Sequence, residues 1–303
     1  MMTAEMHNQP SGELRLNEPM AAHTSWRVGG PARRWYRPAG LDDLRAFLRT
    51  LPADEPVYWV GLGSNLLVRD GGIDATVIVP FGGLDELTLL PGDRVRAGAG
   101  VTCAKVARFA ARAGLVGAEF LAGIPGTMGG ALAMNAGAFG GETWPLVESV
   151  EMIARNGDLR RRTPADFQIG YRSVQGAGEE WFVAADLKLA KGDAESGQSR
   201  IRELLDRRSA TQPVSQPSCG SVFKNPPGDH AARLIEAAGL KGERVGQAEV
   251  SRKHANFIVN LGGACAHDIE ALIERVKRRV LESQGVQLTT EVRILGTPRV
   301  KES

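Results

Sequence analysis

The chain has 303 residues, of which 43% are hydrophobic and 24% charged, as in an ordinary soluble globular protein of about two domains. Its net charge of +2 provides no general attraction to nucleic acid or to a membrane surface, so the composition argues against both classes of partner. Its three cysteines are spaced neither as a disulfide framework nor as a zinc site.

The first residues predict little structure. Residues 1–18 are polar and predict a flexible segment, and residues 1–13 lack the apolar stretch of a secretory signal, which favours the cytoplasm. Hydrophobic spacing and turn residues then predict helix 41–51, strands 57–60, 76–80 and 94–99, helix 102–113, hairpin strands 147–154 and 159–163, and strand 181–189. Thr102 is placed to cap the start of its helix, and Gly114 to end it.

The composition changes after residue 189. Segment 190–199 is small and polar and predicts a linker into a charged helix ending near Ser209, so we expect a domain boundary within 190–210. Beyond it the pattern predicts helix 230–238, strand 256–260, helix 268–283 and strand 291–295. This mixed order favours an α+β fold over a doubly wound sheet, and neither the Rossmann nor the P-loop glycine fingerprint is present.

The most unusual segment is 123–137, GIPGTMGGALAMNAG. Five of these fifteen residues are glycine, and no charge occurs between Glu119 and Glu142. The segment predicts a main chain wrapped around a ligand, such as a phosphate or a planar cofactor, because exposed backbone N–H groups bind anions. Its glycines, Pro125 and Asn135 argue against a transmembrane helix, whereas a tight structural loop without a ligand stays open.

Further motifs place polar groups on turns. Segment 61–65, GLGSN, follows a predicted strand and can point several N–H groups at an anion. Segment 216–226 places the hydroxyl of Ser221, the ammonium of Lys224 and the amide of Asn225 close together on a predicted turn. The three arginines at 160–162 follow an Asn-Gly turn and predict a solvated strand, not a nucleic-acid patch.

Two shorter motifs carry charges. Segment 169–173 contains Arg172, and segment 290–293 places Glu291 and Arg293 on the same face of a strand. Taken alone, these residues also fit a surface arginine and a cross-strand surface pair, and Ser221 also fits a turn cap.

The chain resembles the UDP-N-acetylenolpyruvoylglucosamine reductase family, MurB, in six motifs that occur in the family's order. These are GLGSNLLVRDGG (61–72), AGIPGTMGGALAMNAGAFGGE (122–142), YRSV (171–174), SCGSVFKNP (218–226), HANFIVN (254–260) and TEVRILG (290–296). The segment TSWRVGGPA (24–32) also fits, so the resemblance extends from about residue 17 to residue 296.

The resemblance implies a flavoenzyme of peptidoglycan precursor synthesis. Such an enzyme reduces the enolpyruvyl ether of UDP-N-acetylenolpyruvoylglucosamine to UDP-N-acetylmuramate, with FAD as cofactor and NADPH as hydride source. It also implies an FAD-binding domain similar to the vanillyl-alcohol-oxidase (PCMH-type) fold over 19–192, in subdomains of about 19–82 and 83–192, and a C-terminal α+β substrate-binding domain over 205–303.

The resemblance also implies roles for individual residues. The FAD pyrophosphate and ring would be held by Gly61, Leu62, Gly63, Ser64, Asn65, Leu66, Gly123, Ile124, Pro125, Gly126, Thr127, Gly129, Gly130, Ala133, Asn135, Ala136 and Gly137. Arg172 would stabilise the negative charge that develops on the substrate, Glu291 would orient its carboxylate, and Ser221 would protonate C2. Substrate or NADPH would be contacted by Lys224, Asn225, His254, Asn256 and Arg293.

Other family features bear on the cysteines, metals and active-site closure. Cys219 would neighbour Ser221 without acting as a nucleophile, and the histidine spacing predicts no metal. No histidine lies in or beside either flavin motif, so FAD would be bound non-covalently. Tyr171 is the last tyrosine, so the chain resembles the shorter branch of the family, which lacks an inserted tyrosine loop.

Two other functions remain alternatives at this stage. One is an oxidase of the same flavin fold that acts on a different alcohol or sugar. The other is a non-catalytic nucleotide-binding protein whose glycine loops hold only a phosphate. No obligatory protein partner is expected.

Overall fold

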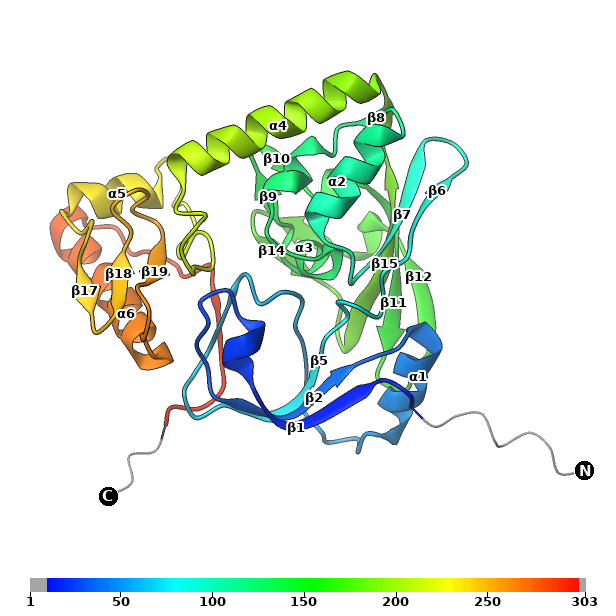
Figure 1. The fold of residues 1–303 in the computed structure, drawn as a ribbon, viewed down its shortest axis with the longest axis horizontal. Coiled ribbons are helices and arrows are strands. Elements are labelled where there is room, and N and C mark those ends of the chain that lie inside the picture. The colour runs from blue at the N-terminus through cyan, green and yellow to red at the C-terminus, as the bar shows by residue number, and fades with distance from the viewer. Residues whose placement is uncertain (1–9, 300–303) are drawn as a thin grey trace, which may run out of the picture. The chain divides into compact units, whose positions relative to one another are not determined.

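The computed structural model describes residues 10–299 and leaves 1–9 and 300–303 outside the described range (Figure 1). The chain forms two units built from discontinuous segments. The first unit contains the described residues up to 16, together with 34–61 and 75–206; the second contains 17–33, 62–74 and the described residues from 207 onward. The contiguous domain limits expected from the sequence remain a prediction. In the structure, segments 17–33 and 62–74 group with the C-terminal half of the chain.

An antiparallel sheet of five strands in the order β12-β11-β15-β7-β6 forms the centre of the first unit (Figure 1). Its strands are β6 (Leu87–Leu90), β7 (Arg94–Gly98), β11 (Val147–Ala154), β12 (Leu159–Arg162) and β15 (Glu180–Lys188). Their buried side chains share one core with α2 (Cys103–Arg112) and α3 (Met128–Met134). Val95, Val106 and Leu132 are members of this core and are at most 1% exposed.

A second sheet has the order β1-β2-β5-β3. Its strands are β1 (Glu13–Pro19), β2 (Pro31–Arg37), β5 (Ile73–Ile78) and β3 (Val57–Trp59), and α1 (Leu41–Thr50) lies between β2 and β3 in the chain. β3 runs parallel to β5, with Val57 opposite Thr76. The rings of Tyr36 and Phe47 stack at 3.5 Å in a core that also includes residues of α1.

The second unit contains a small antiparallel sheet, β17 (Arg244–Val245), β18 (Ala248–Val250) and β19 (Ile258–Asn260), with α5 (Ala231–Ala237) and α6 (Ala266–Gln284) (Figure 1). The predicted apolar stripe of α6 is buried, in agreement with its helical spacing. The same core includes Trp26 and Leu67. β4 (Leu66–Val68) pairs in parallel with β20 (Arg293–Leu295).

Several further elements are short. They are β8 (Leu115–Val116), β9 (Gly137–Ala138), β10 (Gly141–Glu142), β13 (Gln168–Gly170), β14 (Ser173–Gln175), β16 (Ala190–Lys191) and the 3-10 helices η1 (Met20–His23), η2 (Glu119–Gly123), η3 (Trp144–Leu146) and η4 (Pro164–Asp166). Within residues 10–299, no helix is long and apolar enough to cross a membrane.

Most of the predicted elements are present, and the helix limits at 102–113 are confirmed in detail. The Thr102 hydroxyl accepts a hydrogen bond from the Lys105 N–H at 3.2 Å, and Gly114 follows the helix with φ +71°. The α+β class is also confirmed, because helices and antiparallel strands alternate without a doubly wound sheet.

Three expectations need correction. The predicted linker over 190–199 is wrong for residues 194–199, because α4 (Ala194–Thr211) begins there. The Asp193 carboxylate caps the start of α4 by accepting a hydrogen bond from the Ser196 N–H at 2.7 Å. The flexible segment predicted over 1–18 is wrong for residues 13–18, which belong to β1, while 1–9 lie outside the described residues. The glycine segment contains α3, a helix that its glycine content did not predict.

Candidate active site

A cavity of about 260 Å³ in the first unit gathers several residues predicted to hold the cofactor. Its walls come from the end of β3, from α3 and the residue before it, and from the segment that leads into β15. The predicted cofactor residues that line it are Gly61, Thr127, Gly129, Gly130 and Ala133. Part of the glycine segment therefore faces a cavity, as a ligand-binding main chain would.

Gly61 and Thr127 bring the two glycine motifs into contact. A Cβ atom on Gly61 would lie 2.5 Å from Oγ1 of Thr127, closer than non-bonded atoms can approach. Glycine at 61 is therefore required by this close approach of two loops. At Gly130, by contrast, a Cβ atom would meet only the Thr127 hydroxyl, at 3.9 Å, so the cavity has space beside the main chain.

Aromatic side chains also line the cavity, and the sequence analysis did not identify them. The rings of Trp59 and Trp181 stack at 5.4 Å with an interplanar angle of 16°, and Phe182 and Glu180 lie beside them. The indole N–H of Trp59 is buried and has no acceptor among the described residues. Flat apolar walls beside exposed glycine main chain suit a cofactor that combines planar rings with phosphates, so these residues fit FAD.

The other predicted cofactor residues lie elsewhere. Gly123 is buried against the ring of Phe139, which occupies the position a Cβ atom would take. Segment 62–66 belongs to the second unit. The cavity is also not lined by Ile124, Pro125, Gly126, Asn135, Ala136 or Gly137. Cofactor contacts of all these residues remain predictions.

Arg172 occupies a tight turn of the first unit. β13 and β14 pair with Gly170 opposite Ser173, so Tyr171 and Arg172 form the two-residue turn between them. Arg172 has φ +51°, in the left-handed region that side chains other than those of Asn and Asp rarely enter. Such strain is often found at functional sites. The guanidinium donates to the main-chain carbonyl of Gly137 at 2.7 Å, which anchors it on the glycine segment.

Ser221 and Glu291 lie on neighbouring segments of the second unit. The main-chain carbonyl of Val222 accepts from the Glu291 N–H at 2.8 Å, and the Lys224 N–H donates to the Thr289 carbonyl at 2.9 Å. Phe223 and Thr290 form an antiparallel bridge. The predicted proton donor and the predicted carboxylate-orienting residue are therefore brought together by main-chain pairing.

Asn256 supports the Ser221 segment from its other side. Its amide oxygen accepts from the Phe223 N–H at 3.0 Å, and its amide nitrogen donates to the Phe223 carbonyl at 2.8 Å. The side chain is buried, and its main-chain carbonyl accepts from the Val222 N–H at 2.9 Å. These bonds give Asn256 a role in holding the segment that carries Ser221.

Asn65 joins the GLGSN motif to the Glu291 segment. Its amide nitrogen donates to the Glu291 carbonyl at 3.2 Å, and its own carbonyl accepts from the Arg293 N–H at 3.0 Å. The parallel pairing of β4 with β20 continues this contact, with Leu66 opposite Arg293. A predicted cofactor loop and a predicted catalytic segment are thus part of one hydrogen-bonded arrangement within the second unit.

The remaining predicted contact residues lie around the same segments. Asn225 is exposed, and its amide oxygen accepts from the Ala231 N–H at 3.1 Å, where α5 begins. Lys224 is half-buried and Arg293 is exposed. The ring nitrogen Nδ1 of His254 accepts from the Asn256 N–H at 3.3 Å, and burial lowers the pKa of His254 below its ordinary value of 6.5. His254 is therefore neutral at pH 7.

Comparison with known proteins identifies the family. Residues 212–295 match the profile described as UDP-N-acetylenolpyruvoylglucosamine reductase, C-terminal domain, and residues 32–163 match an FAD binding domain. The UDP-N-acetylenolpyruvoylglucosamine reductase of Alkalilimnicola ehrlichii is 64% identical, over 98% of this chain and 99% of its own length. The chain belongs to the UDP-N-acetylenolpyruvoylglucosamine reductase family. The reductase of Methylococcus capsulatus is 62% identical over 92% of each chain.

Solved structures agree with this assignment. The crystal structure of the MurB reductase from Thermus caldophilus superimposes with a TM-score of 0.79 at 36% identity, covering 94% of this chain and 99% of that one. The chain is therefore an FAD-dependent reductase of peptidoglycan precursor synthesis, with a PCMH-type FAD-binding domain and a MurB C-terminal domain. The family resemblance seen in the six sequence motifs is confirmed.

Cys219, two residues before Ser221, is buried beside main-chain carbonyl groups. Its thiol is buried and lies 3.5 Å from the Gly63 carbonyl and 3.4 Å from the Leu66 carbonyl, within reach of a hydrogen bond to either. Burial raises the pKa of Cys219 to about 12, so the thiol stays protonated at neutral pH. A nucleophilic thiolate is therefore not available here.

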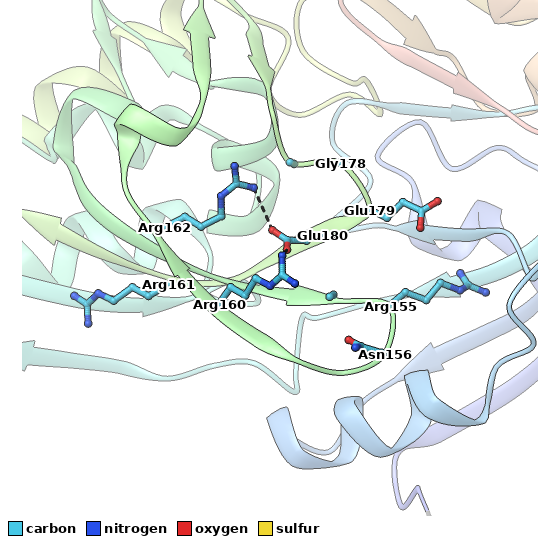
Figure 2. Close-up of a pocket in the computed structure, with 10 residues that line it drawn as sticks. Arg155, Asn156, Arg160, Arg161, Arg162, Gly178, Glu179 and Glu180 are labelled. Atoms are coloured by element: carbon cyan, nitrogen blue, oxygen red, sulfur yellow. Dashed lines mark hydrogen bonds and ion pairs between the residues drawn. The ribbon is translucent and has the colours of Figure 1, made fainter.

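An open hollow of about 860 Å³ in the first unit is lined by the arginine run of β12 (Figure 2). Arg160 and Arg162 pair with Glu180 at 3.0 and 3.1 Å, and Arg161 pairs with Asp186 at 2.7 Å. The run follows the β11–β12 turn on an edge strand, as the sequence predicts, and its charges are compensated by carboxylates. Since Glu180 also lines the cavity of about 260 Å³, these pairs help to hold a wall of that cavity in place.

Proposed function

We propose that the chain reduces the enolpyruvyl ether of UDP-N-acetylenolpyruvoylglucosamine to the lactyl ether, forming UDP-N-acetylmuramate at the expense of NADPH. FAD, when bound, would supply the hydride chemistry at C3 of the enolpyruvyl group with NADPH as the reductant, and the protein would orient the substrate and move the proton. Family membership supports this reaction, and one observation carries the residue assignment. The Glu291 main chain is bonded on one side to the Ser221 segment and on the other to Asn65 of the GLGSN motif.

Ser221 is our proposed proton donor. Hydride addition at C3 leaves negative charge on C2 and its carboxylate, and the Ser221 hydroxyl gives a proton to C2 and regains one from solvent. A serine hydroxyl is a weak acid, so it must be held within hydrogen-bond reach of a strongly basic carbon. The bonds of Val222 to Glu291 and Asn256 fix the main chain beside Ser221 and would supply this orientation.

Arg172 and Glu291 are assigned to the substrate carboxylate. A guanidinium stabilises developing negative charge most effectively when it is already held in position, and Arg172 is bound to the glycine segment. We further propose that Lys224, Asn225, His254 and Arg293 contact the substrate or NADPH. Because both polar atoms of the Asn256 amide are bonded to Phe223, we assign Asn256 to the support of Ser221.

For the cofactor, we propose that the GLGSN motif holds the FAD pyrophosphate and that residues 123–137 wrap the flavin. The cavity lined by Gly61, Gly130 and Trp181 would take part of the same molecule. We propose that FAD is bound non-covalently, because no histidine lies in or beside either flavin motif of the sequence. We also propose a cytoplasmic location, the shorter branch of the family, and action without a nucleic-acid, membrane or obligatory protein partner.

Separate measurement of the two half-reactions tests the assignment. Ser221→Ala should keep flavin bleaching by NADPH at the wild-type rate and lose reoxidation by the UDP-sugar. Ser215→Ala, an exposed serine nearby in the chain, is the matched control and should keep both rates. If Ser221→Ala keeps both half-reactions, Ser221 is not the acid. If NADPH oxidation does not depend on the UDP-sugar, the proposed reaction itself is wrong.

A further inference from the structure

Asn135 occupies an unusual position at the end of α3. It is 2% exposed and has φ +47°, so a buried amide side chain stands at a left-handed helix end. Glycine is the residue most often found in this conformation after a helix, because it has no Cβ atom to strain. An asparagine here is expected to use its side chain, since buried amide groups are almost always hydrogen-bonded.

The side chain of Asn135 joins three other segments. Its amide nitrogen donates to the Glu142 carboxylate at 2.9 Å and to the Gly170 carbonyl at 3.1 Å. Its amide oxygen accepts from the Trp144 N–H at 3.1 Å. These bonds connect β10, the start of η3 and the last residue of β13, so one side chain fixes the glycine segment against the β13–β14 hairpin.

The hairpin that Asn135 holds is the one that presents Arg172. Gly170 is paired with Ser173 across the turn, so the bond to its carbonyl acts two residues before Arg172. The main-chain carbonyl of Asn135 also accepts from the guanidinium at 3.4 Å, beside the shorter bond to Gly137. Asn135 therefore contacts both the base of the turn and the charged group at its tip.

Gly137 shows how closely these groups are packed. A Cβ atom on Gly137 would lie 3.0 Å from Nη1 of Arg172 and 3.3 Å from Cγ of Glu142. The arginine and the carboxylate that Asn135 holds thus lie against the same glycine. Loss of the Asn135 amide would release the hairpin and Glu142 together and let the guanidinium shift.

We propose that Asn135 is the positioning residue for Arg172: its side-chain amide fixes the turn, and its main-chain carbonyl helps to hold the guanidinium. This inference rests on the proposed function of Arg172. It differs from a helix-capping role, which glycine would fill equally well at this φ. A shift of about 1 Å in a group that must meet the transition state costs about 100-fold in rate.

The test compares Asn135→Gly, which keeps the left-handed main chain and removes the amide, with Asp93→Gly as control. Asp93 also has a positive φ, +59°, and lies in the turn between β6 and β7. Because Asn135 lies in the segment proposed to wrap the flavin, each rate is expressed per bound FAD, measured from its absorbance, and flavin reduction by NADPH is measured beside reoxidation. An effect on the flavin alone would slow both half-reactions and would overturn the proposal. Reoxidation by the UDP-sugar should be about 100-fold slower in Asn135→Gly only. Asn135→Asp, which keeps side-chain size and the acceptor for Trp144 but lacks both donors, should show the same loss.

Arg172→Lys separates this inference from the function on which it rests, because lysine keeps the charge and loses the planar fork. If Asn135 acts through Arg172, the double variant Asn135→Gly/Arg172→Lys should reoxidise no more slowly than Arg172→Lys alone. A slow Arg172→Lys with a wild-type Asn135→Gly, or losses that multiply in the double variant, would overturn the positioning role alone. A wild-type rate in Arg172→Lys would overturn the role of Arg172 and, with it, the inference.

Discussion

Replacing Asn256 by alanine should destabilise the protein and slow proton transfer, because this side chain holds the segment that carries Ser221. The substitution removes two hydrogen bonds, at 3.0 and 2.8 Å, and leaves the N–H and the carbonyl of Phe223 without these partners in a buried place. Each unsatisfied buried group costs about 1–3 kcal/mol, so the free energy of unfolding should fall by about 2–6 kcal/mol. That is a large share of the roughly 5–15 kcal/mol typical of a folded protein.

Urea denaturation of the FAD-loaded enzyme measures this change directly. The control is Asn156→Ala, because the Asn156 side chain is exposed and bonds to Asp158 of its own turn, so the variant should lose less than about 1 kcal/mol. Reoxidation of the reduced flavin by the UDP-sugar should slow in Asn256→Ala, while reduction by NADPH should not. An unchanged urea midpoint together with a raised KM for the UDP-sugar would refute the reasoning and make Asn256 a substrate-contact residue.

Three further substitutions or titrations have defined outcomes. Gly61→Ala should weaken FAD binding to the apoprotein at least about 10-fold, because its new methyl group would force the two predicted cofactor loops apart. The control Gly40→Ala should bind FAD normally, because a Cβ atom on Gly40 would meet no atom within 4 Å. A neutral thiol reagent at pH 7.5 should modify exposed Cys265 first, and the two buried cysteines only after denaturation; fast reaction of a second thiol would contradict their burial. Because burial lowers the pKa of His254 below 6.5, the unfolded chain takes up a proton before the folded one, so the free energy of unfolding should fall as pH drops below 6.5. His254→Gln should lessen that decline, and an NMR titration giving a His254 pKa above 6.5 would reverse the sign.

Local patterns in the sequence were sufficient wherever the determining contacts are local. The helix at Cys103–Arg112 has its capping threonine and terminating glycine within two residues of its ends, and α6 shows its buried stripe in its spacing. The GLGSN and glycine-rich motifs likewise predict close main-chain approach, and Gly61 meets Thr127 as expected of such loops. Each of these features depends on residues only a few positions apart or on backbone freedom that glycine alone provides.

Features that depend on distant segments were not predictable in the same way. Trp59 and Trp181 lie on predicted strands, where an aromatic residue more often fills a core, so their place in the cavity needed the fold. A clue was present in the position of Trp59, two residues before Gly61. The strand β1 is stabilised by pairing with β2, and its Leu14 and Leu16 are exposed. Its sequence therefore has no buried face whose alternation could predict a strand. The positive φ of Arg172 is contrary to the preference of its residue type.

The second unit also imposes an order on protein synthesis. Trp26 leaves the ribosome early, yet its indole N–H donates at 2.7 Å to the carbonyl of Ile258, and Leu67 on β4 pairs with Ile294. Both early segments belong to a core that α6 completes near the end of the chain. The nascent polypeptide must therefore carry these apolar side chains, without their final partners, through most of translation. A premature stop before β19 would leave both side chains without these partners and would give an aggregation-prone fragment instead of a separately folded flavin domain.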